Sequence, residues 1–212
     1  MNRPDGDGPY PGLVVIHEIM GLTDHIKDIT SRLAGEGYAA LALDIFSAGN
    51  TAICIWKCLQ AVRSGKTDHF AVHYLQSGLD YLAAQPFVDK DRLGAIGFCM
   101  GGNFALSLAC LDKRIKTIAP FYGLTPSQVE VTSLCRVVGS YPTMDATTKS
   151  AGKLAAKLDE TSIAHDIKFY PGAVHCFMND RLPLFYKAQA ASDSWQRTLS
   201  FFAEHLRKNQ LQ

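Results

Sequence analysis

The pentapeptide Gly97-Phe98-Cys99-Met100-Gly101 follows the apolar run Leu93-Gly94-Ala95-Ile96 and leads into a helix-like stretch, Asn103 to Leu111. This order predicts a strand, a tight turn and a helix, with Cys99 on the turn. A nucleophile in such a turn occupies a strained backbone position, and small neighbours allow the strand and the helix to approach closely. The pattern G-x-C-x-G arises by chance elsewhere, but its place after a predicted strand makes Cys99 a candidate nucleophile.

Outward from this turn, apolar runs alternate with helical spacings along the chain. The runs are typical of strands that a parallel sheet buries on both faces, and they lie at residues 13–16, 38–43, 93–97, 117–121, 135–141 and 166–170. Helical spacing of apolar residues predicts helices at residues 24–34, around 75–82, at 103–111, around 154–158 and at 191–206. Residues 45–65 have no clear period. The sequence therefore predicts an α/β fold, a mostly parallel sheet flanked by helices on both faces, as a single domain over residues 1–212.

Two further candidate residues lie just past the ends of later predicted strands. Asp145 follows the strand that ends at Tyr141, and His175 follows the strand that ends at Tyr170. The carboxyl ends of parallel strands meet at one edge of a sheet, where ligands bind. We therefore expect Asp145 and His175 to lie near Cys99, in the order nucleophile, acid, histidine along the chain.

Each candidate also has a plain structural interpretation. Cys99 could be a buried thiol in a glycine-rich turn, and Asp145 is well placed to cap the following helix. Two other aspartates fit the triad less well, because Asp159 falls in a helix and Asp166 at the start of a strand. His175 is one of seven histidines, but it lies in a glycine-rich loop past the last predicted strand. The three residues together favour the catalytic interpretation.

These residue types predict acyl transfer by a thiol. A helix N-terminus favours the thiolate form of Cys99, which attacks an ester or thioester carbonyl to give an acyl-enzyme that water then hydrolyses. His175 takes the proton from Cys99 or from the hydrolytic water. The backbone N–H of Met100, with that of Ile19 in the loop after the first strand, is expected to form the oxyanion hole. Glu18, directly after Val14-Val15-Ile16, is expected to be half-buried and to need a partner, although an ordinary exposed carboxylate is the alternative.

At these residues the chain resembles the dienelactone hydrolases (carboxymethylenebutenolidases) of the α/β-hydrolase superfamily. The resemblance covers nearly the whole chain and rests on His17-Glu18-Ile19-Met20-Gly21, Gly97 to Gly102, Tyr122-Gly123, Ser140-Tyr141 with Asp145, Tyr170-Pro171-Gly172-Ala173 with His175 and Phe177, and residues 195–206. It implies the α/β-hydrolase fold, with Cys99 as nucleophile, His175 as general base and Asp145 as its orienter. It also implies that Glu18 governs the charge state of the thiol.

The chain departs from this family at the groups that hold a substrate carboxylate. The family uses arginines, one of them four residues after the triad histidine, where this chain has Asn179. Arg181 lies nearby but out of register, and Arg63 is the other candidate. Tyr122 and Phe177 adjoin catalytic segments and are expected to line the pocket or to be core aromatics. The family also carries one or two leading antiparallel strands, whereas the first strong strand here begins at residue 13.

Composition excludes several function classes. The net charge is +1 with no basic or acidic run, so we expect neither nucleic acid nor a membrane as a partner. No stretch approaches about 20 consecutive apolar residues, and the N-terminus lacks the apolar centre of a signal peptide, so a cytoplasmic location is expected. Cys54 and Cys58 are spaced C-x3-C without a second ligand pair, so no metal site and no cofactor are expected.

The sequence thus predicts a hydrolase that cleaves a small ester or enol-lactone through a Cys99–His175–Asp145 triad, in a monomer or small homo-oligomer. One alternative is a thioesterase or general carboxylesterase that uses the same residues. The other, from a different class, is a catalytically silent α/β-hydrolase that binds a small ligand.

Overall fold

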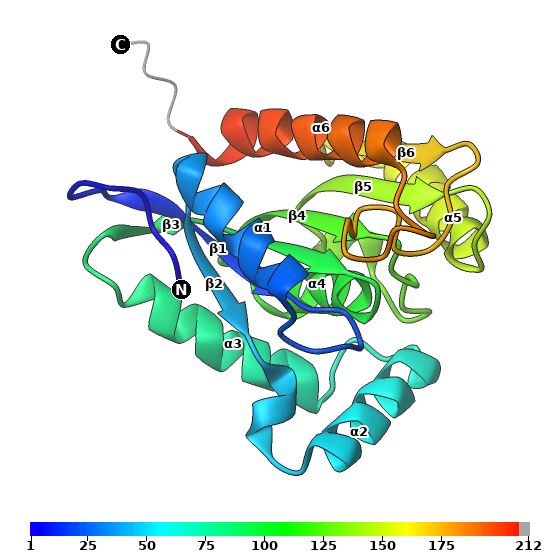
Figure 1. Ribbon diagram of the computed structural model, residues 1–212, viewed down its shortest axis with the longest axis horizontal. Coiled ribbons are helices and arrows are strands. Elements are labelled where there is room, and N and C mark those ends of the chain that lie inside the picture. The colour runs from blue at the N-terminus through cyan, green and yellow to red at the C-terminus, as the bar shows by residue number, and fades with distance from the viewer. Residues whose placement is uncertain (208–212) are drawn as a thin grey trace.

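A computed structural model describes residues 1–207, whose centre is a six-stranded sheet in the order β2-β1-β3-β4-β5-β6 (Figure 1). All five pairs of neighbouring strands are parallel. The strands are β1 (Tyr10–Ile16), β2 (Ala39–Leu43), β3 (Val88–Phe98), β4 (Ile115–Phe121), β5 (Arg136–Pro142) and β6 (His165–Tyr170). The predicted α/β architecture is confirmed, and residues 208–212 of the predicted domain lie outside the described residues.

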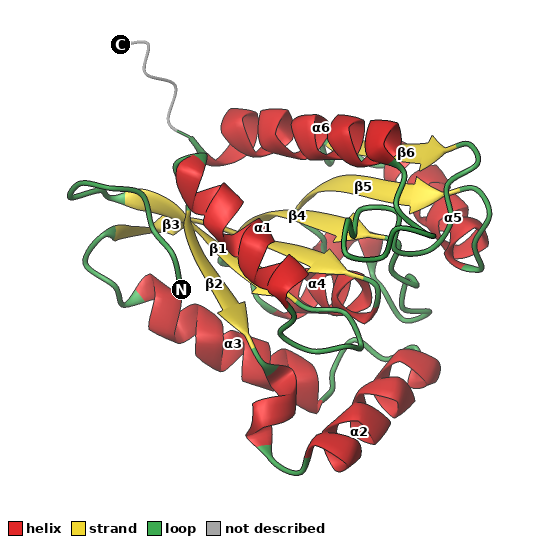
Figure 2. Ribbon diagram, viewed as in Figure 1, coloured by secondary structure: helices red, strands yellow, loops and turns green. Residues whose placement is uncertain are grey.

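Helices cover both faces of the sheet (Figure 2). They are α1 (Asp24–Gly35), α2 (Thr51–Ser64), α3 (Phe70–Ala83), α4 (Met100–Leu111), α5 (Thr147–Asp159) and α6 (Ala188–Leu206), with short 3-10 helices η1 (Ile45–Ala48) and η2 (Val131–Ser133). Apolar residues of α1 and α6 form one core layer with one face of the sheet, and those of α3, α4 and α5 form the second layer with the other face. No helix in the described part of the chain is long and apolar enough to cross a membrane.

The interior strand β1 shows why the apolar runs predicted the sheet. Leu13 and Val15 pack into the layer of α1 and α6, whereas Val14 and Ile16 pack into the layer of α3 and α4. All four side chains are fully buried, because successive side chains of a strand point to opposite faces and both faces are covered. Before β1, the chain makes an isolated antiparallel bridge between Asn2 and Ala40 rather than a leading strand.

Residues 45–65, which have no clear period in the sequence, form η1 and α2. Helix α2 begins after Asn50, whose side chain accepts a hydrogen bond from the backbone N–H of Ile53. It extends beyond the sheet edge, and Trp56 is 60% exposed. Cys54 and Cys58 lie on its buried side, where burial raises the pKa of the Cys58 thiol to about 12. Within residues 1–207, no cluster of three or more His, Cys, Asp or Glu side chains has the arrangement of a metal site.

Candidate active site

The candidate catalytic residues follow different strands and meet at one edge of the sheet. Cys99 follows β3, Tyr122 follows β4, Asp145 follows β5, His175 follows β6, and Glu18 follows β1. Because all these strands are parallel, their carboxyl ends lie on the same side, which is the usual ligand-binding edge of an open α/β sheet. Residues far apart in the sequence are therefore neighbours in space.

The turn at Cys99 has the strained geometry that its sequence predicts. Cys99 has φ 55° and ψ −119°, and its backbone N–H donates to the carbonyl of Phe121 at 3.0 Å. A Cβ atom on Gly97 would lie 2.0 Å from the carbonyl oxygen of Gly101, and one on Gly101 would lie 2.3 Å from that of Ile16. Only glycine fits at these two positions, so β3, α4 and β1 can approach closely and present Cys99 at the N-terminus of α4.

Asp145 and His175 form a direct pair. Nδ1 of His175 lies 2.5 Å from Oδ2 of Asp145, which fixes the ring tautomer with the proton on Nδ1. The other carboxylate oxygen, Oδ1, accepts the backbone N–H of Thr147 at 2.7 Å, at the start of α5. The Asp145 carboxylate therefore contacts His175 through one oxygen and the start of α5 through the other.

The charges around His175 favour its protonated form. Burial by itself lowers the pKa of His175, but hydrogen bonds to Asp145 and Cys99 and the negative charges on both raise it to about 10. Burial raises the pKa of Asp145, and the hydrogen bonds from His175 and Thr147 outweigh this and lower it. An imidazolium next to a thiolate is the arrangement that activates a cysteine nucleophile.

Glu18 is only 1% exposed, so it is fully buried and not half-buried or exposed as the sequence predicted. Its Oε1 accepts the hydroxyl of Tyr122 at 3.2 Å, and its Oε2 accepts the side-chain amide of Asn179 at 3.0 Å. Both carboxylate oxygens are thereby satisfied, as a buried carboxylate requires. Burial and the Glu18 charge both raise the pKa of Tyr122, so this phenol remains a hydrogen-bond donor.

His17 holds the loop that carries Glu18. Its Nε2 accepts the backbone N–H of Ile45 at 3.0 Å, so the ring proton is on Nδ1, which donates to the carbonyl of Glu18 at 2.6 Å. Burial lowers the pKa of His17 and favours the neutral ring that this arrangement needs. The His17 ring thus connects the loop after β1 to the start of η1 through two hydrogen bonds.

A cavity of about 340 Å³ opens at Cys99. The sequence-predicted residues that line it are Ile19, Cys99, Met100, Tyr122, Asp145 and His175. In the described part of the chain, the backbone N–H groups of Ile19 and Met100 have no hydrogen-bond partner. Two donors are therefore free beside the thiol, at the positions predicted for an oxyanion hole.

Three of the predicted substrate-binding residues lie elsewhere. Phe177 is fully buried and packs edge-on against Tyr122, with ring centroids 5.4 Å apart, so it supports the pocket wall from behind. The side chain of Arg181 is 66% exposed beside Asp180. Arg63 is exposed on α2. The preceding residue, Val62, lines the cavity, and successive residues of a helix are rotated by about 100°, so the Arg63 side chain points away from it. None of the three lines the cavity.

The sequence did not indicate several residues that the structure places at the cavity. Leu59 and Val62 line it from α2, and their i, i+3 spacing is the one signal in a region without a clear period. Asn103 and Leu124 also line it, and the amide of Asn103 donates to the carbonyl of Leu124 at 2.7 Å. The Oδ1 atom of Asn103 is buried without a partner in the described residues.

Comparisons with known proteins identify the family of the chain. The model of the dienelactone hydrolase family matches residues 1–206. A protein of Saccharolobus solfataricus described as a "Putative carboxymethylenebutenolidase" is 31% identical over 92% of this chain and 90% of its own length. The crystal structure of a dienelactone hydrolase-like promiscuous phosphotriesterase from metagenomic libraries superposes with a TM-score of 0.81 at 28% identity, covering 95% of this chain and 89% of the other.

A more distant structure shares the fold alone. An esterase of Pyrobaculum calidifontis superposes with a TM-score of 0.72 at 14% identity, over 95% of this chain and 78% of the other. From its sequence match and its fold, the chain is a hydrolase and belongs to the dienelactone hydrolase family.

Proposed function

We propose that the protein hydrolyses a small ester or enol-lactone through the triad Cys99, His175 and Asp145. The observation that carries this proposal is the 2.5 Å contact between Asp145 and His175 at the wall of a cavity that also contains the Cys99 thiol. A nucleophile, a base and a group that orients the base are the parts that acyl transfer needs.

The proposed reaction has two halves. The Cys99 thiolate adds to the carbonyl carbon, and the oxyanion that forms accepts the N–H groups of Ile19 and Met100. The tetrahedral adduct expels the alcohol or enol oxygen, which takes a proton from the His175 imidazolium, and a thioester to Cys99 remains. Neutral His175 then accepts a proton from water, and the hydroxide attacks the thioester carbonyl. The C–S bond of this second adduct breaks, which releases the carboxylic acid and restores the Cys99 thiolate beside the His175 imidazolium.

Glu18 has a supporting role in this proposal. Its buried negative charge, held by Tyr122 and Asn179, lies behind the nucleophile rather than at the cavity wall. A negative charge at this place stabilises protons and cations nearby, so it controls how the charge is shared between the thiol and His175. Glu18 is therefore a positioning residue and does not touch the substrate.

The cavity supports a small substrate. Its volume of about 340 Å³ lies at the low end for ligand pockets, and Leu59, Val62 and Leu124 contribute apolar walls. Neither Arg63 nor Arg181 lines it, so within this cavity no arginine meets the reacting part of a substrate. Hydrolysis of a thioester or a simple carboxylic ester requires the same residues and remains the second candidate.

The test is a burst experiment with p-nitrophenyl acetate. We expect wild-type protein to release about one equivalent of p-nitrophenol per site before steady turnover, and to carry one acetyl group on Cys99 by mass spectrometry. Cys99→Ala is expected to lose both signals. The control is Cys176→Ser, which alters the neighbouring thiol, whose pKa burial raises, and is expected to retain the burst. Turnover by Cys99→Ala at the wild-type rate would disprove the triad, and ligand binding without any burst would favour the catalytically silent alternative.

A second experiment addresses the two arginines. We expect Arg63→Ala and Arg181→Ala to leave kcat/KM unchanged, within about twofold, for both a carboxylated dienelactone and its methyl ester, because neither side chain lines the cavity. A thousandfold preference of wild-type protein for the acid, abolished by either substitution, would show that the arginine reaches the substrate after all.

A further inference from the structure

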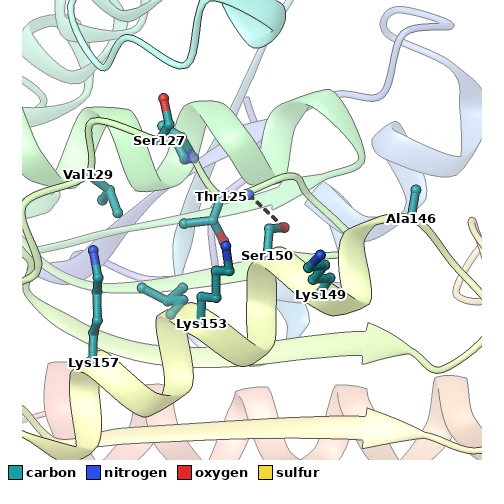
Figure 3. A pocket seen from close by; sticks show the side chains of 10 residues that line it. Thr125, Ser127, Val129, Ala146, Lys149, Ser150, Lys153 and Lys157 are labelled. Atoms are coloured by element: carbon teal, nitrogen blue, oxygen red, sulfur yellow. Dashed lines mark hydrogen bonds between the residues drawn. The ribbon is translucent and has the colours of Figure 1, made fainter.

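A second cavity lies beside the active site, between α5 and the loop that follows β4 (Figure 3). Its volume is about 420 Å³. One wall is a face of α5 that carries Lys149, Lys153 and Lys157, and the opposite wall is the loop from Thr125 to Val129. Figure 3 shows Lys153 and Lys157 extending from α5 toward that loop.

The three lysines form a continuous basic stripe. They are spaced i, i+4 and i+8, which places all three on one face of the helix, over a length of about 12 Å. Within residues 1–207, none of their side chains forms an ion pair or a hydrogen bond. Like charges at this spacing repel one another, so the stripe destabilises α5 unless an anion neutralises it.

The opposite wall contributes one hydrogen-bonding group without a partner in the described part of the chain, the hydroxyl of Thr125. The Thr125 hydroxyl is buried and has no partner in the described residues, and the Thr125 backbone N–H donates to the Ser150 hydroxyl at 3.3 Å. A hydroxyl without a partner, in a cavity lined by three lysines, suits an oxyanion, which accepts from both kinds of donor. Acidic side chains are absent from this cavity lining.

The catalytic cavity and the basic cavity share a wall at the N-terminus of α5. Ala146 lines both of them, and the consecutive residues Leu124 and Thr125 line the catalytic and the basic cavity respectively. Asp145, the residue before Ala146, is in turn bound to His175. The two cavities are therefore neighbours, and Ala146 and the segment Leu124-Thr125 lie between them.

We propose that this cavity binds an anionic group at the far end of the substrate, a phosphate or a carboxylate. The proposal rests on the proposed function and narrows its substrate class to esters or thioesters that carry an oxyanion at the end remote from the scissile carbonyl. The lysines bind this group and take no part in the chemistry.

Binding can be measured without turnover. The probes are coenzyme A, which carries phosphates, and citrate, which carries carboxylates, titrated calorimetrically into Cys99→Ala protein at low salt. We expect at least one probe to bind at one site of Cys99→Ala protein. Its Kd is expected to rise tenfold or more when Lys149→Gln, Lys153→Gln and Lys157→Gln are added to that protein. The tighter probe identifies the phosphate or the carboxylate source. The control is Lys27→Gln/Lys90→Gln/Lys113→Gln, which removes the same charge from exposed lysines elsewhere and is expected to change Kd less than twofold.

A second test compares kcat/KM for anionic and neutral substrates on protein that retains Cys99. The pairs are acetyl-coenzyme A against S-acetyl-N-acetylcysteamine, and p-nitrophenyl hydrogen glutarate against p-nitrophenyl butyrate. We expect the triple lysine variant to lose about tenfold in kcat/KM for the anionic member of at least one pair and less than twofold for its neutral partner. Absence of probe binding, or equal losses in the control variant, would overturn the lysine site. Failure of every ester to react would disprove the proposed function and would leave the binding experiment to decide this proposal independently.

Discussion

At the scale of single residues, the Glu18 carboxylate is a charged group that the fold removes from solvent. It is almost completely buried and accepts two hydrogen bonds, one from the Tyr122 hydroxyl after β4 and one from the Asn179 amide after β6. Asn179, the residue where the family pattern has an arginine, supplies the second donor. A neutral amide therefore satisfies Glu18, and the site keeps one more negative charge than an arginine would allow.

We expect Asn179→Leu to destabilise the protein by about 1–3 kcal/mol, because it leaves one oxygen of a buried carboxylate without a donor. Urea unfolding measures the loss. The control is a double-mutant cycle with Glu18→Gln, in which the double variant is expected to lose less than the sum of the single variants. Strict additivity would show that the 3.0 Å contact between Asn179 and Glu18 contributes no coupling energy.

Glu18→Gln itself is expected to affect chemistry more than stability. Glutamine retains an acceptor for the Tyr122 hydroxyl but removes the charge behind the nucleophile, so kcat is expected to fall about tenfold or more, the scale of a lost proton-handling group. The rate of Cys99 alkylation by iodoacetamide as a function of pH is measured alongside it. Unchanged kcat together with an unchanged alkylation profile would make Glu18 purely structural.

At the scale of elements, the turn between β3 and α4 depends on close packing of backbones. Gly97 and Gly101 lie against the carbonyl groups of Gly101 and Ile16, which cannot move without displacing α4 or the interior strand β1. Helix α5 offers a contrast, because a Cβ atom on Gly152 would meet no heavy atom within 4 Å. The same residue type is thus required in one helix-forming segment and dispensable in another.

We expect Gly97→Ala to cost more than about 3 kcal/mol or to prevent folding, since its Cβ would overlap a backbone carbonyl that cannot relax cheaply. Gly152→Ala, the matched control, is expected to stabilise the protein by roughly 0.5–1 kcal/mol through helix propensity. Thermal unfolding of both variants measures the difference. Similar Tm values for the two would contradict the close packing of the turn.

At the scale of the whole molecule, the pair Asp145–His175 makes stability depend on pH. Folding raises the pKa of His175 from 6.5 to about 10, so the folded protein binds this proton more tightly than the unfolded chain does. Stability from this group is fully present below pH 6.5 and is lost as the pH rises through about 10. Asp145 lies in the loop after β5 and His175 in the loop after β6, so this titration reports on the contact between those two loops.

We expect the difference in unfolding free energy between wild-type protein and Asp145→Asn to be largest near pH 6 and to shrink as the pH approaches 10. The asparagine cannot stabilise the imidazolium, so burial then lowers the pKa of His175 and the variant lacks the pH-dependent contribution. Urea unfolding at several pH values measures it. The control is Asp68→Asn at the exposed pair with His73, where we expect a small effect because surface pairs contribute little. A gap that grows with pH would reverse the assigned sign.

Several features of this protein could be predicted from local sequence. Buried parallel strands need continuous apolar runs, and Val14-Val15-Ile16 is such a run. The turn at Cys99 needs a glycine at position 97 for a steric reason that acts over four residues, because a Cβ atom there would overlap the carbonyl of Gly101. Asp145 and His175 follow strand ends, and parallel topology then brings them to one edge. These predictions depend on backbone periodicity and chain order, which the sequence determines by itself.

Only the tertiary structure decided which side chains face one another across that edge. It turned Val62 into the cavity and Arg63 away from it, paired Asn179 with Glu18, and placed Phe177 behind Tyr122. It also brought the lysines of α5 against the loop after β4. Such contacts join residues separated by up to 161 positions, and the direction of each side chain is set by packing against elements that local periodicity does not specify.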